Sequence, residues 1–498
     1  MEVAKTDAIA YADPQALVPR VQSILWLAVA IAICFKVLLE IVQQSFFLDG
    51  LIYASIGRNL AEGIGTVWAP QFSKTLFPVF AEHPPLMMWL QSWFFRLFGD
   101  TVIVDKLFSL ATCAISLSIL AMIWRRLNGA DFELRQATPI VLTLTIIAGR
   151  LGWGFANGLL ENLLIVFTSL SVYCVVLAYD NHCARRRLCF IVAAGILTAL
   201  AVMTKGPVGL FPLATPGIYW ASFRRPSFVI TMIDTVLIGV VVAVLFGLMW
   251  TMEGPRGAVE RYVAVQLLTS LSGVRGHNGS GLAAFRTFVR LNTYPLLVTA
   301  IVLFLGRGVA RAFGEAALRQ SRVRRAMFFA LSGFSASFPL LVAPRVSSFY
   351  FNPSLPYFSA ALAVVCAPVL LAMLSALHHK SQWRVQLVFV GLLGLSLFLT
   401  IFHFGRPGYH AVTIRNAENI ASQVCSSNGQ CEAVVSTCGA AHTDWLLHAY
   451  LQRYFRISLD DPAVPSGTYL LASDDCAAKA GYRDTGAAVA PYRLIRRE

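Results

Sequence analysis

The chain is dominated by long apolar stretches that recur between residues 21 and 403. Each stretch is about 16–24 residues long, the length that an α-helix needs to cross the hydrocarbon core of a bilayer. With 57% hydrophobic and only 13% charged residues, the composition is not that of a soluble globular protein. The pattern predicts a polytopic α-helical membrane protein with about eleven transmembrane helices. The predicted spans are residues 21–43, 101–124, 137–152, 160–179, 188–204, 207–222, 228–250, 289–307, 326–342, 353–374 and 385–403.

The placement of basic residues predicts the orientation of these spans. A net charge of +14 is compatible with nucleic-acid binding, but the arginines and lysines gather in short loops, on one side at every second loop. This is the positive-inside pattern of membrane proteins, so we interpret the charge as a topology signal and expect no nucleic-acid partner. The clusters are Arg125-Arg126, Arg185-Arg186-Arg187, Arg224-Arg225, residues 307–325, and Lys380 with Arg384.

The chain divides into three predicted parts. Residues 1–20 form a cytoplasmic lead, and residues 21–403 form a transmembrane domain with periplasmic loops at 44–100 and 251–288. Residues 404–498 form a small periplasmic C-terminal domain. Because the first apolar stretch is long and lacks a small-residue cleavage site, we expect a retained helix and not a cleaved signal peptide. The expected location is a bacterial inner (plasma) membrane, with the C-terminus facing the periplasm.

The C-terminal part alternates helix-like and strand-like patterns, which predicts an α/β unit. Helical patterns cover 411–424 and 444–455, and strand-like runs cover 433–435, 468–472 and 492–495. Four cysteines in an exported segment permit two disulfides in three possible pairings, and free thiols are the alternative. These are Cys425, Cys431, Cys438 and Cys476. This C-terminal part could either dock the acceptor or support the membrane domain.

The first external segment carries an acid at its start and an acid–imidazole pair near its end. Asp49 directly follows an apolar span, where a carboxylate can accept a proton from an acceptor hydroxyl or simply cap a helix. In Glu82-His83-Pro84-Pro85, the prolines fix the backbone before a predicted helix. Glu82 and His83 are thereby presented rigidly to a metal or a phosphate, unless the motif only starts the helix.

Two charged residues lie at interruptions of later spans. Lys205, in Thr204-Lys205-Gly206-Pro207, is costly in a membrane unless it reaches the interface or pairs with an anion. It is therefore placed either to contact a phosphate or to extend toward the interface. Glu161 lies at the external end of another span, where it is a second acid of the same cavity or a helix-end charge.

Two later external loops add further candidates. The glycine-rich loop 251–288 carries Arg275 and His277, and such a loop can order over a membrane site when lipid binds. His277 would join Glu82 at a divalent metal, because imidazole and carboxylate ligands suit zinc. The turn at 344–356 offers Arg345 as a forked phosphate clamp and Tyr350 as a hydroxyl donor, or else these residues anchor the loop.

In this order, these pieces resemble the GT-C superfamily of polyprenyl-phosphate-dependent glycosyltransferases, nearest to the aminoarabinose transferase (ArnT) and protein O-mannosyltransferase group. The resemblance covers about residues 21–360 and is strongest in the first external segment. The matching motifs are Asp49, Tyr53-Ala54-x-Ile56-Gly57-Arg58-Asn59-Leu60, Glu82-His83-Pro84-Pro85-Leu86, Leu97-Phe98-Gly99, Lys205-Gly206-Pro207 and residues 345–356.

The resemblance implies roles for these residues. Asp49 matches the first acid of the catalytic Asp-Glu pair of the family, and Glu82 matches an acid that can hold a metal, with His277 as its partner. The metal would be zinc, magnesium or manganese. Expected substrate-binding side chains, some of them facing the donor phosphate, are Tyr53, Arg58, His83, Lys205, Arg275, Arg345 and Tyr350.

The chain also departs from the family pattern. Gly50 stands where the typical pair has glutamate, so the second acid is absent or its role passes to Glu161. His83 stands where the aminoarabinose enzymes carry lysine, and Arg345 stands where lysine is more usual. The donor sugar, hexose or pentose, therefore does not follow from the resemblance.

These observations predict a membrane glycosyltransferase that moves a sugar from a polyprenyl-phosphate donor to a periplasmic acceptor with inversion. The acceptor is lipid A, another glycan or a protein, and membrane lipids surround the chain. Lys205, Arg345 and a metal would stabilise the leaving phosphate. The alternatives are a lipid-linked sugar flippase or other transporter, which predicts paired charges buried in mid-span, and a scaffold. The notable charges stand at the external boundary, which favours an enzyme.

Overall fold

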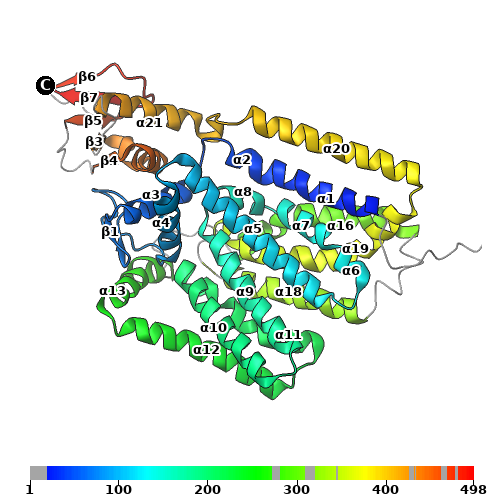
Figure 1. Cartoon of the computed structure of the whole chain (residues 1–498). Helices are drawn as coiled ribbons and strands as arrows, with labels where there is room; N and C mark the ends of the chain where they lie inside the picture. Colours follow the sequence, from blue (N-terminus) through cyan, green and yellow to red (C-terminus); the bar gives the residue numbers. More distant parts are fainter. Residues whose placement is uncertain are drawn as a thin grey trace, which may run out of the picture.

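The computed structural model is a long helical bundle with an α/β unit at one end (Figure 1). The structure describes residues 19–271, 281–308, 320–341, 343, 346–425, 431, 433–460, 468–476 and 481–498. The long apolar helices run side by side along the bundle. The shorter polar helices gather at the end that carries the C-terminal sheet. That end therefore collects the polar segments that the sequence predicts to be external.

Within the described residues, seven helices are long and apolar enough to cross a membrane. An eighth candidate is the bent pair α15 (Gly281–Leu291) and α16 (Thr293–Leu305), whose axes differ by 51°. The chain is therefore a multi-pass membrane protein. The seven are Pro19–Ile41 (α1 to α2), Val102–Leu127 (α5), Leu160–Asp180 (α9), Ala184–Phe223 (α10 to α11), Phe228–Trp250 (α12), Ser348–Ala376 (η4 and α19) and His379–Phe402 (α20).

The predicted count of eleven spans is not confirmed, because hydropathy windows do not reveal bends and breaks. The predicted spans 188–204 and 207–222 form one continuous segment, in which the 3-10 turn η2 (Gly206–Ala214) joins α10 (Ala184–Lys205) to α11 (Thr215–Phe223). The span predicted at 137–152 is the ten-residue helix α7 (Thr138–Ile147). The helix α18 (Gln320–Leu341) is long, but its arginines and serines lower its hydropathy.

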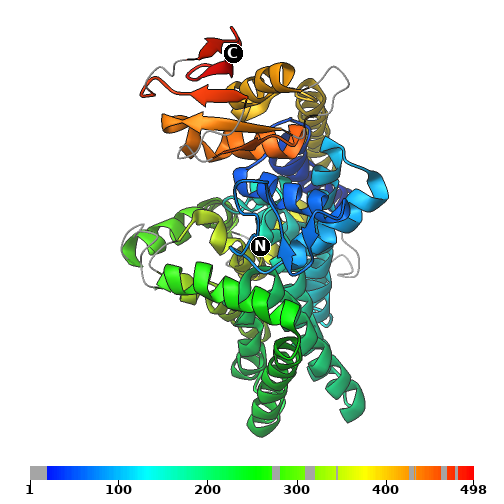
Figure 2. The ribbon, with the colours of Figure 1, turned by 90° about the vertical axis from the view of Figure 1, so that its left-hand side faces the viewer.

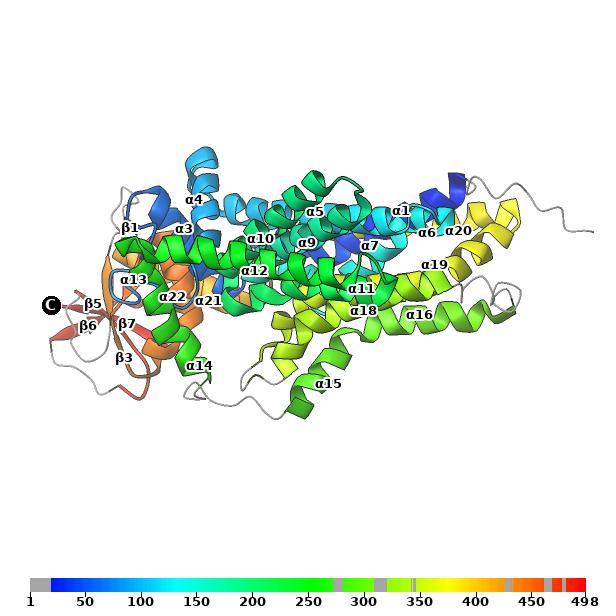
Figure 3. The same ribbon diagram turned by 90° about the horizontal axis from the view of Figure 1, so that it is seen from below.

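The bundle has a buried centre and a lipid-facing periphery. The apolar window of α9 is 67% buried, whereas those of α12 and α20 are only 17% and 11% buried. Figure 3 shows α12 and α16 on the outside of the bundle, where their exposed apolar side chains suit a hydrocarbon environment. The central helix α9 carries Glu161 in its first turn, so this acid lies inside the protein.

The predicted external segment 44–100 folds into two helices, α3 (Leu48–Ala61) and α4 (Leu86–Phe98), with a short hairpin between them. Its strands are β1 (Gly65–Thr66) and β2 (Ala69–Pro70). The two helices pack closely at Gly57, where an added Cβ would lie 2.8 Å from the Gln91 Cβ. Asp49 is therefore held in the first turn of a packed helix and not in a loop.

The C-terminal part contains the helices and strands expected from its sequence pattern. The helix α21 (Ala411–Val424) and the pair α22 (Trp445–Tyr450) and η7 (Leu451–Phe455) accompany a five-stranded sheet of order β4-β3-β5-β7-β6. β3 pairs in parallel with β4 and β5, and β7 pairs antiparallel with β5 and β6. Disulfides join Cys425 to Cys431 and Cys438 to Cys476. The strands are β3 (Val434–Cys438), β4 (Ser458–Leu459), β5 (Tyr469–Ala472), β6 (Tyr482–Asp484) and β7 (Arg493–Arg497).

The C-terminal unit lies directly against α3 (Figure 2). Phe46, just before α3, and Leu51, in its first turn, share an apolar cluster with residues of α21, α22 and the sheet. The Tyr450 hydroxyl accepts a hydrogen bond of 2.9 Å from the Phe46 backbone N–H. The C-terminal unit therefore supports the helix that carries Asp49.

Candidate active site

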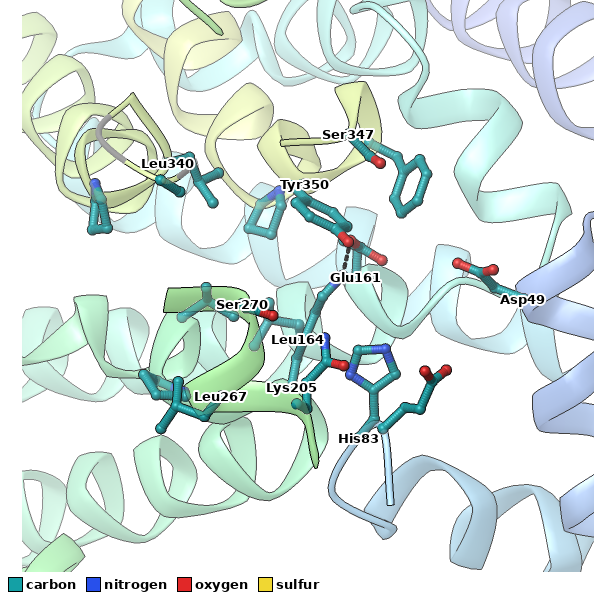
Figure 4. A pocket seen from close by; sticks show the side chains of 18 of the residues that line it. Asp49, His83, Glu161, Leu164, Lys205, Leu267, Ser270, Leu340, Ser347 and Tyr350 are labelled. Carbon is teal, nitrogen blue, oxygen red and sulfur yellow. Dashed lines mark hydrogen bonds and ion pairs between the residues drawn. The ribbon is translucent and has the colours of Figure 1, made fainter. Parts of the chain in front are cut away.

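A cavity of about 570 Å³ opens at the end of the bundle that carries α3 and the sheet. Its walls come from α3, the segment before α4, α9, the α10–η2 turn, η4 and α18, and from α13 (Glu253–Tyr262) with the π-helical turn η3 (Val263–Leu268). Figure 4 shows the side chains from these separate elements facing one space. Seven residues proposed from the sequence line this cavity: Asp49, Tyr53, Glu82, His83, Glu161, Lys205 and Tyr350.

Lys205 and Glu161 form an ion pair between Nζ and Oε1 inside the cavity. Their side chains are only 10% and 2% exposed. The Lys205 Nζ also lies 4.2 Å from the centre of the Tyr350 ring, a cation–π contact. Lys205 thus points into the protein, and its charge is held between a carboxylate and an aromatic face.

The backbone at Gly206 explains why Lys205 ends its helix there. Gly206 has φ +73°, a left-handed conformation that L side chains rarely adopt. An added Cβ would also lie 2.8 Å from the Tyr262 Cζ, so the space is already filled by the tyrosine. The break in the helix is therefore a defined turn that fixes Lys205 at the cavity.

Asp49 is the residue of the cavity with the clearest base character. Burial raises the pKa of its carboxyl from 3.8 to about 6. The positive charge of Lys205 lowers the pKa, and the negative charges of Glu161 and Glu82 raise it further. A carboxyl with a pKa near 6 is mostly ionised at neutral pH and is a stronger base than an exposed aspartate.

The cavity changes character from one end to the other. In Figure 4, Asp49 lies at one end, and the Lys205–Glu161 pair lies with Tyr350 in the middle. Leu267 and Leu340 lie at the opposite end. An acidic end, a lysine–glutamate ion pair and an apolar end therefore follow one another along a single space.

The start of α3 packs too tightly for a side chain at position 50. A Cβ on Gly50 would overlap the Asn157 carbonyl oxygen and lie 2.8 Å from the Phe46 Cε1. The Asn157 Oδ1 also accepts a hydrogen bond of 2.9 Å from the Phe47 backbone N–H. The glutamate typical of the family cannot be placed here, so the departure at Gly50 is built into the packing.

We expect Gly50→Ala to destabilise the protein by about 1–3 kcal/mol, because the overlap involves backbone and not a flexible side-chain end. The measurement is the thermal unfolding midpoint of the detergent-purified protein. Gly247→Ala in α12 is the matched control, because nothing lies within 4 Å of its added Cβ. An unchanged midpoint for Gly50→Ala would contradict the packing account.

Arg58, expected to bind substrate, is absent from the lining of this cavity. It is 2% exposed and donates hydrogen bonds to the carbonyl oxygens of Gln452 (3.0 Å) and Arg453 (2.9 Å). The guanidinium joins α3 to η7, so we correct its interpretation from substrate contact to structural contact. Arg275, His277 and Arg345 lie outside the residues that the structure describes, and their roles stay predictions.

Tyr262 also lines the cavity, although its sequence position does not single it out. Tyr262 lies at the end of α13, in the segment 251–288 that was interpreted as a loop. Burial raises the pKa of its hydroxyl to about 12, which keeps it protonated and able to donate a hydrogen bond. The sequence around Tyr262 does not indicate that it lines the cavity, because only folding brings this residue next to Gly206.

The predicted metal site rested on Glu82 and His277, and His277 is not among the described residues. In the described part of the chain, no three His, Cys, Asp or Glu side chains lie close enough together to hold a metal ion. The described residues alone therefore do not complete a zinc site, which uses at least three protein ligands, and the divalent metal stays a prediction.

Residues 82–250 match the family model described as dolichyl-phosphate-mannose-protein mannosyltransferase. This segment is less than half of the chain, and it includes Glu82, Glu161 and Lys205. A comparison with curated protein sequences gives no match.

Solved structures extend the likeness to nearly the whole chain. ArnT from Cupriavidus metallidurans in the apo state is 15% identical, with 95% of this chain and 97% of that chain covered and a TM-score of 0.59. The structure of the same protein bound to undecaprenyl phosphate is also 15% identical, with 94% of this chain and 97% of that chain covered and a TM-score of 0.59. The oligosaccharyltransferase from Archaeoglobus fulgidus in the apo form is 13% identical, with 89% of this chain and 65% of that chain covered and a TM-score of 0.53. The predicted resemblance is thus confirmed, and the chain has the fold of the GT-C polyprenyl-phosphate-dependent glycosyltransferases.

Proposed function

We propose that this protein is a membrane glycosyltransferase that moves a sugar from a polyprenyl-phosphate donor to an acceptor on the periplasmic side of a bacterial inner membrane. The observation that carries the proposal is the single cavity in which Asp49, the Lys205–Glu161 pair and an apolar end follow one another. Such a donor has the same three parts in sequence: a sugar, a phosphate and an apolar chain. The crystallised complex of ArnT with undecaprenyl phosphate supports this class of donor.

The lysine in the middle of the cavity suits the leaving phosphate. As the bond between the sugar and the phosphate breaks, negative charge grows on the phosphate oxygens. A preorganised ammonium group in a water-poor site stabilises that charge without costly rearrangement. Lys205 already has its position fixed by Glu161 and Tyr350, so it supplies this group. Attack from the Asp49 end, opposite the phosphate, would invert the anomeric centre.

We expect the double variant Lys205→Met, Glu161→Gln to release polyprenyl phosphate about 10²–10³-fold more slowly, because the stabilising charge is gone. The double change avoids leaving a buried carboxylate unpaired. Initial rates with purified protein are the measurement. Lys380→Met, at an exposed position of α20, is the matched control and should keep the normal rate. Equal rates for both proteins would remove Lys205 from the mechanism.

The raised pKa of Asp49 predicts a pH dependence. The base is the carboxylate form, whose fraction grows as the pH rises through about 6. We therefore expect kcat/KM to be roughly tenfold lower at a pH of about 5 than on the plateau above about 7, since kcat/KM follows the ionisation of the free enzyme. A flat profile between these values would contradict a base with this pKa.

The experiment that tests the proposed function compares the glycans of cells with and without the chain. Mass spectrometry of lipid A, surface polysaccharide and periplasmic proteins should reveal one sugar that is absent from the deletion strain. The same sugar should be absent from a strain that carries Asp49→Asn. Unchanged glycans in cells that contain the polyprenyl-phosphate sugar would contradict the proposal.

A further inference from the structure

Four cations, which we call the cation patch, gather in the membrane part of the bundle. None of them lines the active-site cavity, and none forms an ion pair with a carboxylate in the described part of the chain. Lys36 lies in the last third of the span Pro19–Ile41, whose end leads to Asp49, so the patch lies on the cavity side of the membrane. The four are Lys36, Arg150 between α7 and α8 (Leu151–Ala156), and Arg286 and Arg290 on α15.

Lys36 lies at an irregular turn of its helix. The π-helical turn η1 (Cys34–Leu38) interrupts the span, and such turns are rare and frequent at functional sites. A Cβ added to Gly152 of α8 would lie 2.7 Å from the Lys36 Cβ, so α8 packs directly on this turn. The Lys36 Nζ lies 5.6 Å from the centre of the Tyr294 ring, at the start of α16. Lys36 therefore lies between the α7–α8 segment and α16.

Two other helix breaks meet beside Lys36. Gly149, between α7 and α8, has φ +46°, and an added Cβ would lie 2.6 Å from the Leu291 Cδ2. Leu291 ends α15 just before the 51° bend into α16, which lies on the outside of the bundle (Figure 3). Arg150 follows Gly149, and Arg290 precedes Leu291. The breaks thus bring the cations to one region of the surface, where Lys36 is half-buried and the three arginines are exposed.

The sequence offers the patch very little negative charge. Residues 261–314, which include α15 and α16, contain no aspartate or glutamate. Glu40 is the acid that follows Lys36, and a single carboxylate does not balance four cations. Arg286 and Arg290 also repel each other, because like charges four residues apart share one face of a helix. Charges in a membrane are costly unless they reach water or meet an anion, so an anion from the surroundings would lower this cost.

The surface around the patch is the lipid-facing surface of the bundle. An exposed apolar stripe runs along α15 beside its arginines and continues along α16. Tyr294 lies where the two helices meet, and tyrosine is typical of the boundary between hydrocarbon and headgroups. A molecule with apolar chains and an anionic head matches this arrangement. The stripe consists of Leu282, Phe285 and Val289 on α15, and Leu297, Ile301 and Phe304 on α16.

Aromatic rings stand between the patch and the active-site cavity. The Arg150 guanidinium lies 5.1 Å from the centre of the Trp153 ring. Trp153 lies edge-on to Phe47, with 5.0 Å between the ring centres, and Phe47 lines the cavity. Lys205, which suits the donor phosphate, lies inside the cavity. The anion of the patch is therefore a different one from the phosphate of a bound donor.

We propose that the cation patch binds the headgroup of an anionic phospholipid from the surrounding leaflet. The phosphodiester of such a lipid carries a negative charge at the boundary between headgroups and hydrocarbon. The planar forks of Arg286 and Arg290 match phosphate oxygens, and basic pockets between membrane helices are known to bind anionic headgroups. The acyl chains lie along the apolar stripe of α15 and α16. The bound lipid thus neutralises the cations and lies behind the cavity wall that contains Phe47.

The test is the affinity of the purified full-length protein for single lipids in a neutral detergent, measured by native mass spectrometry. Phosphatidylglycerol is the anionic probe, and phosphatidylcholine, which has a phosphate but no net charge, is the neutral comparison. We expect phosphatidylglycerol to bind at least about tenfold more tightly. The double variant Arg286→Gln, Arg290→Gln should weaken its binding about 30-fold, since each basic residue contributes about fivefold to the affinity for an anionic lipid.

Two matched variants make this result specific. Arg415→Gln, Arg493→Gln removes the same charge from exposed positions of the C-terminal unit and should leave the phosphatidylglycerol affinity unchanged. Arg286→Lys, Arg290→Lys keeps the charge and should keep most of the affinity. The thermal midpoint of each variant in phosphatidylcholine shows that it is folded.

Three outcomes would overturn the proposal. Equal affinities of the unmodified protein for the two lipids would mean that the cations only extend toward the membrane surface. An unchanged phosphatidylglycerol affinity in the folded Arg286→Gln, Arg290→Gln protein would place the anionic lipid elsewhere. A variant that loses affinity for polyprenyl phosphate but not for phosphatidylglycerol would assign the patch to the donor lipid instead.

Discussion

Replacing Asp49 with asparagine is expected to slow sugar transfer by about 10²–10⁴-fold, the usual contribution of a positioned general base. The amide has nearly the same shape as the carboxylate but cannot accept the acceptor proton. Folding should be unaffected, because burial already disfavours the charge of this carboxyl, as its raised pKa shows. The measurements are the initial rate of glycoside formation and the thermal midpoint of the purified protein.

Two further variants make this result specific. Glu418→Gln makes the same kind of change on the exposed face of α21 and should leave the rate unchanged. Asp49→Glu keeps a carboxylate but lengthens its side chain, so it should retain more activity than asparagine. Nearly normal transfer by Asp49→Asn would exclude a base at this position and would favour an acceptor that arrives already ionised.

Much of the cavity could be predicted from the sequence because its residues share one kind of position. Asp49, Glu161 and Lys205 each lie at the end of an apolar span, and alternating span directions bring such ends to one face of the membrane. The GT-C resemblance added the order of the motifs. The fold class followed from the length of the apolar stretches, which a bilayer dictates.

The remaining features depend on contacts that local sequence does not encode. Arg58 looks like a site residue, yet its partners are backbone carbonyls almost 400 residues later in the chain. The Lys205–Glu161 pair joins two helices, and no spacing rule relates them. The predicted number of spans is not confirmed, because a hydropathy window treats a helix, a 3-10 turn and a bent pair alike. The lack of space for a side chain at Gly50 likewise follows from the contact between α3 and Asn157, which are far apart in the sequence.

Replacing Arg453 with methionine is expected to destabilise the protein by about 3–5 kcal/mol, because it leaves a buried carboxylate without its partner. The Arg453 side chain is 2% exposed, and its Nε lies 2.9 Å from an oxygen of Asp105, whose side chain is 0% exposed. Its Nη1 lies 2.7 Å from Asp100. These bonds join η7 of the C-terminal unit to the start of α5. The measurements are the thermal midpoint and the yield of folded protein.

The neighbouring Arg456 is the control that separates a buried pair from a surface pair. Its side chain is 38% exposed and contacts Glu62 at 2.6 Å and Asp100 at 3.3 Å. Arg456→Met should cost at most about 1 kcal/mol, since water screens an exposed pair. Adding Asp105→Leu to Arg453→Met should recover part of the loss, because it removes the unpaired buried charge. Equal effects of the two arginine variants would mean that apolar packing, and not the buried charges, holds the C-terminal unit against the start of α5.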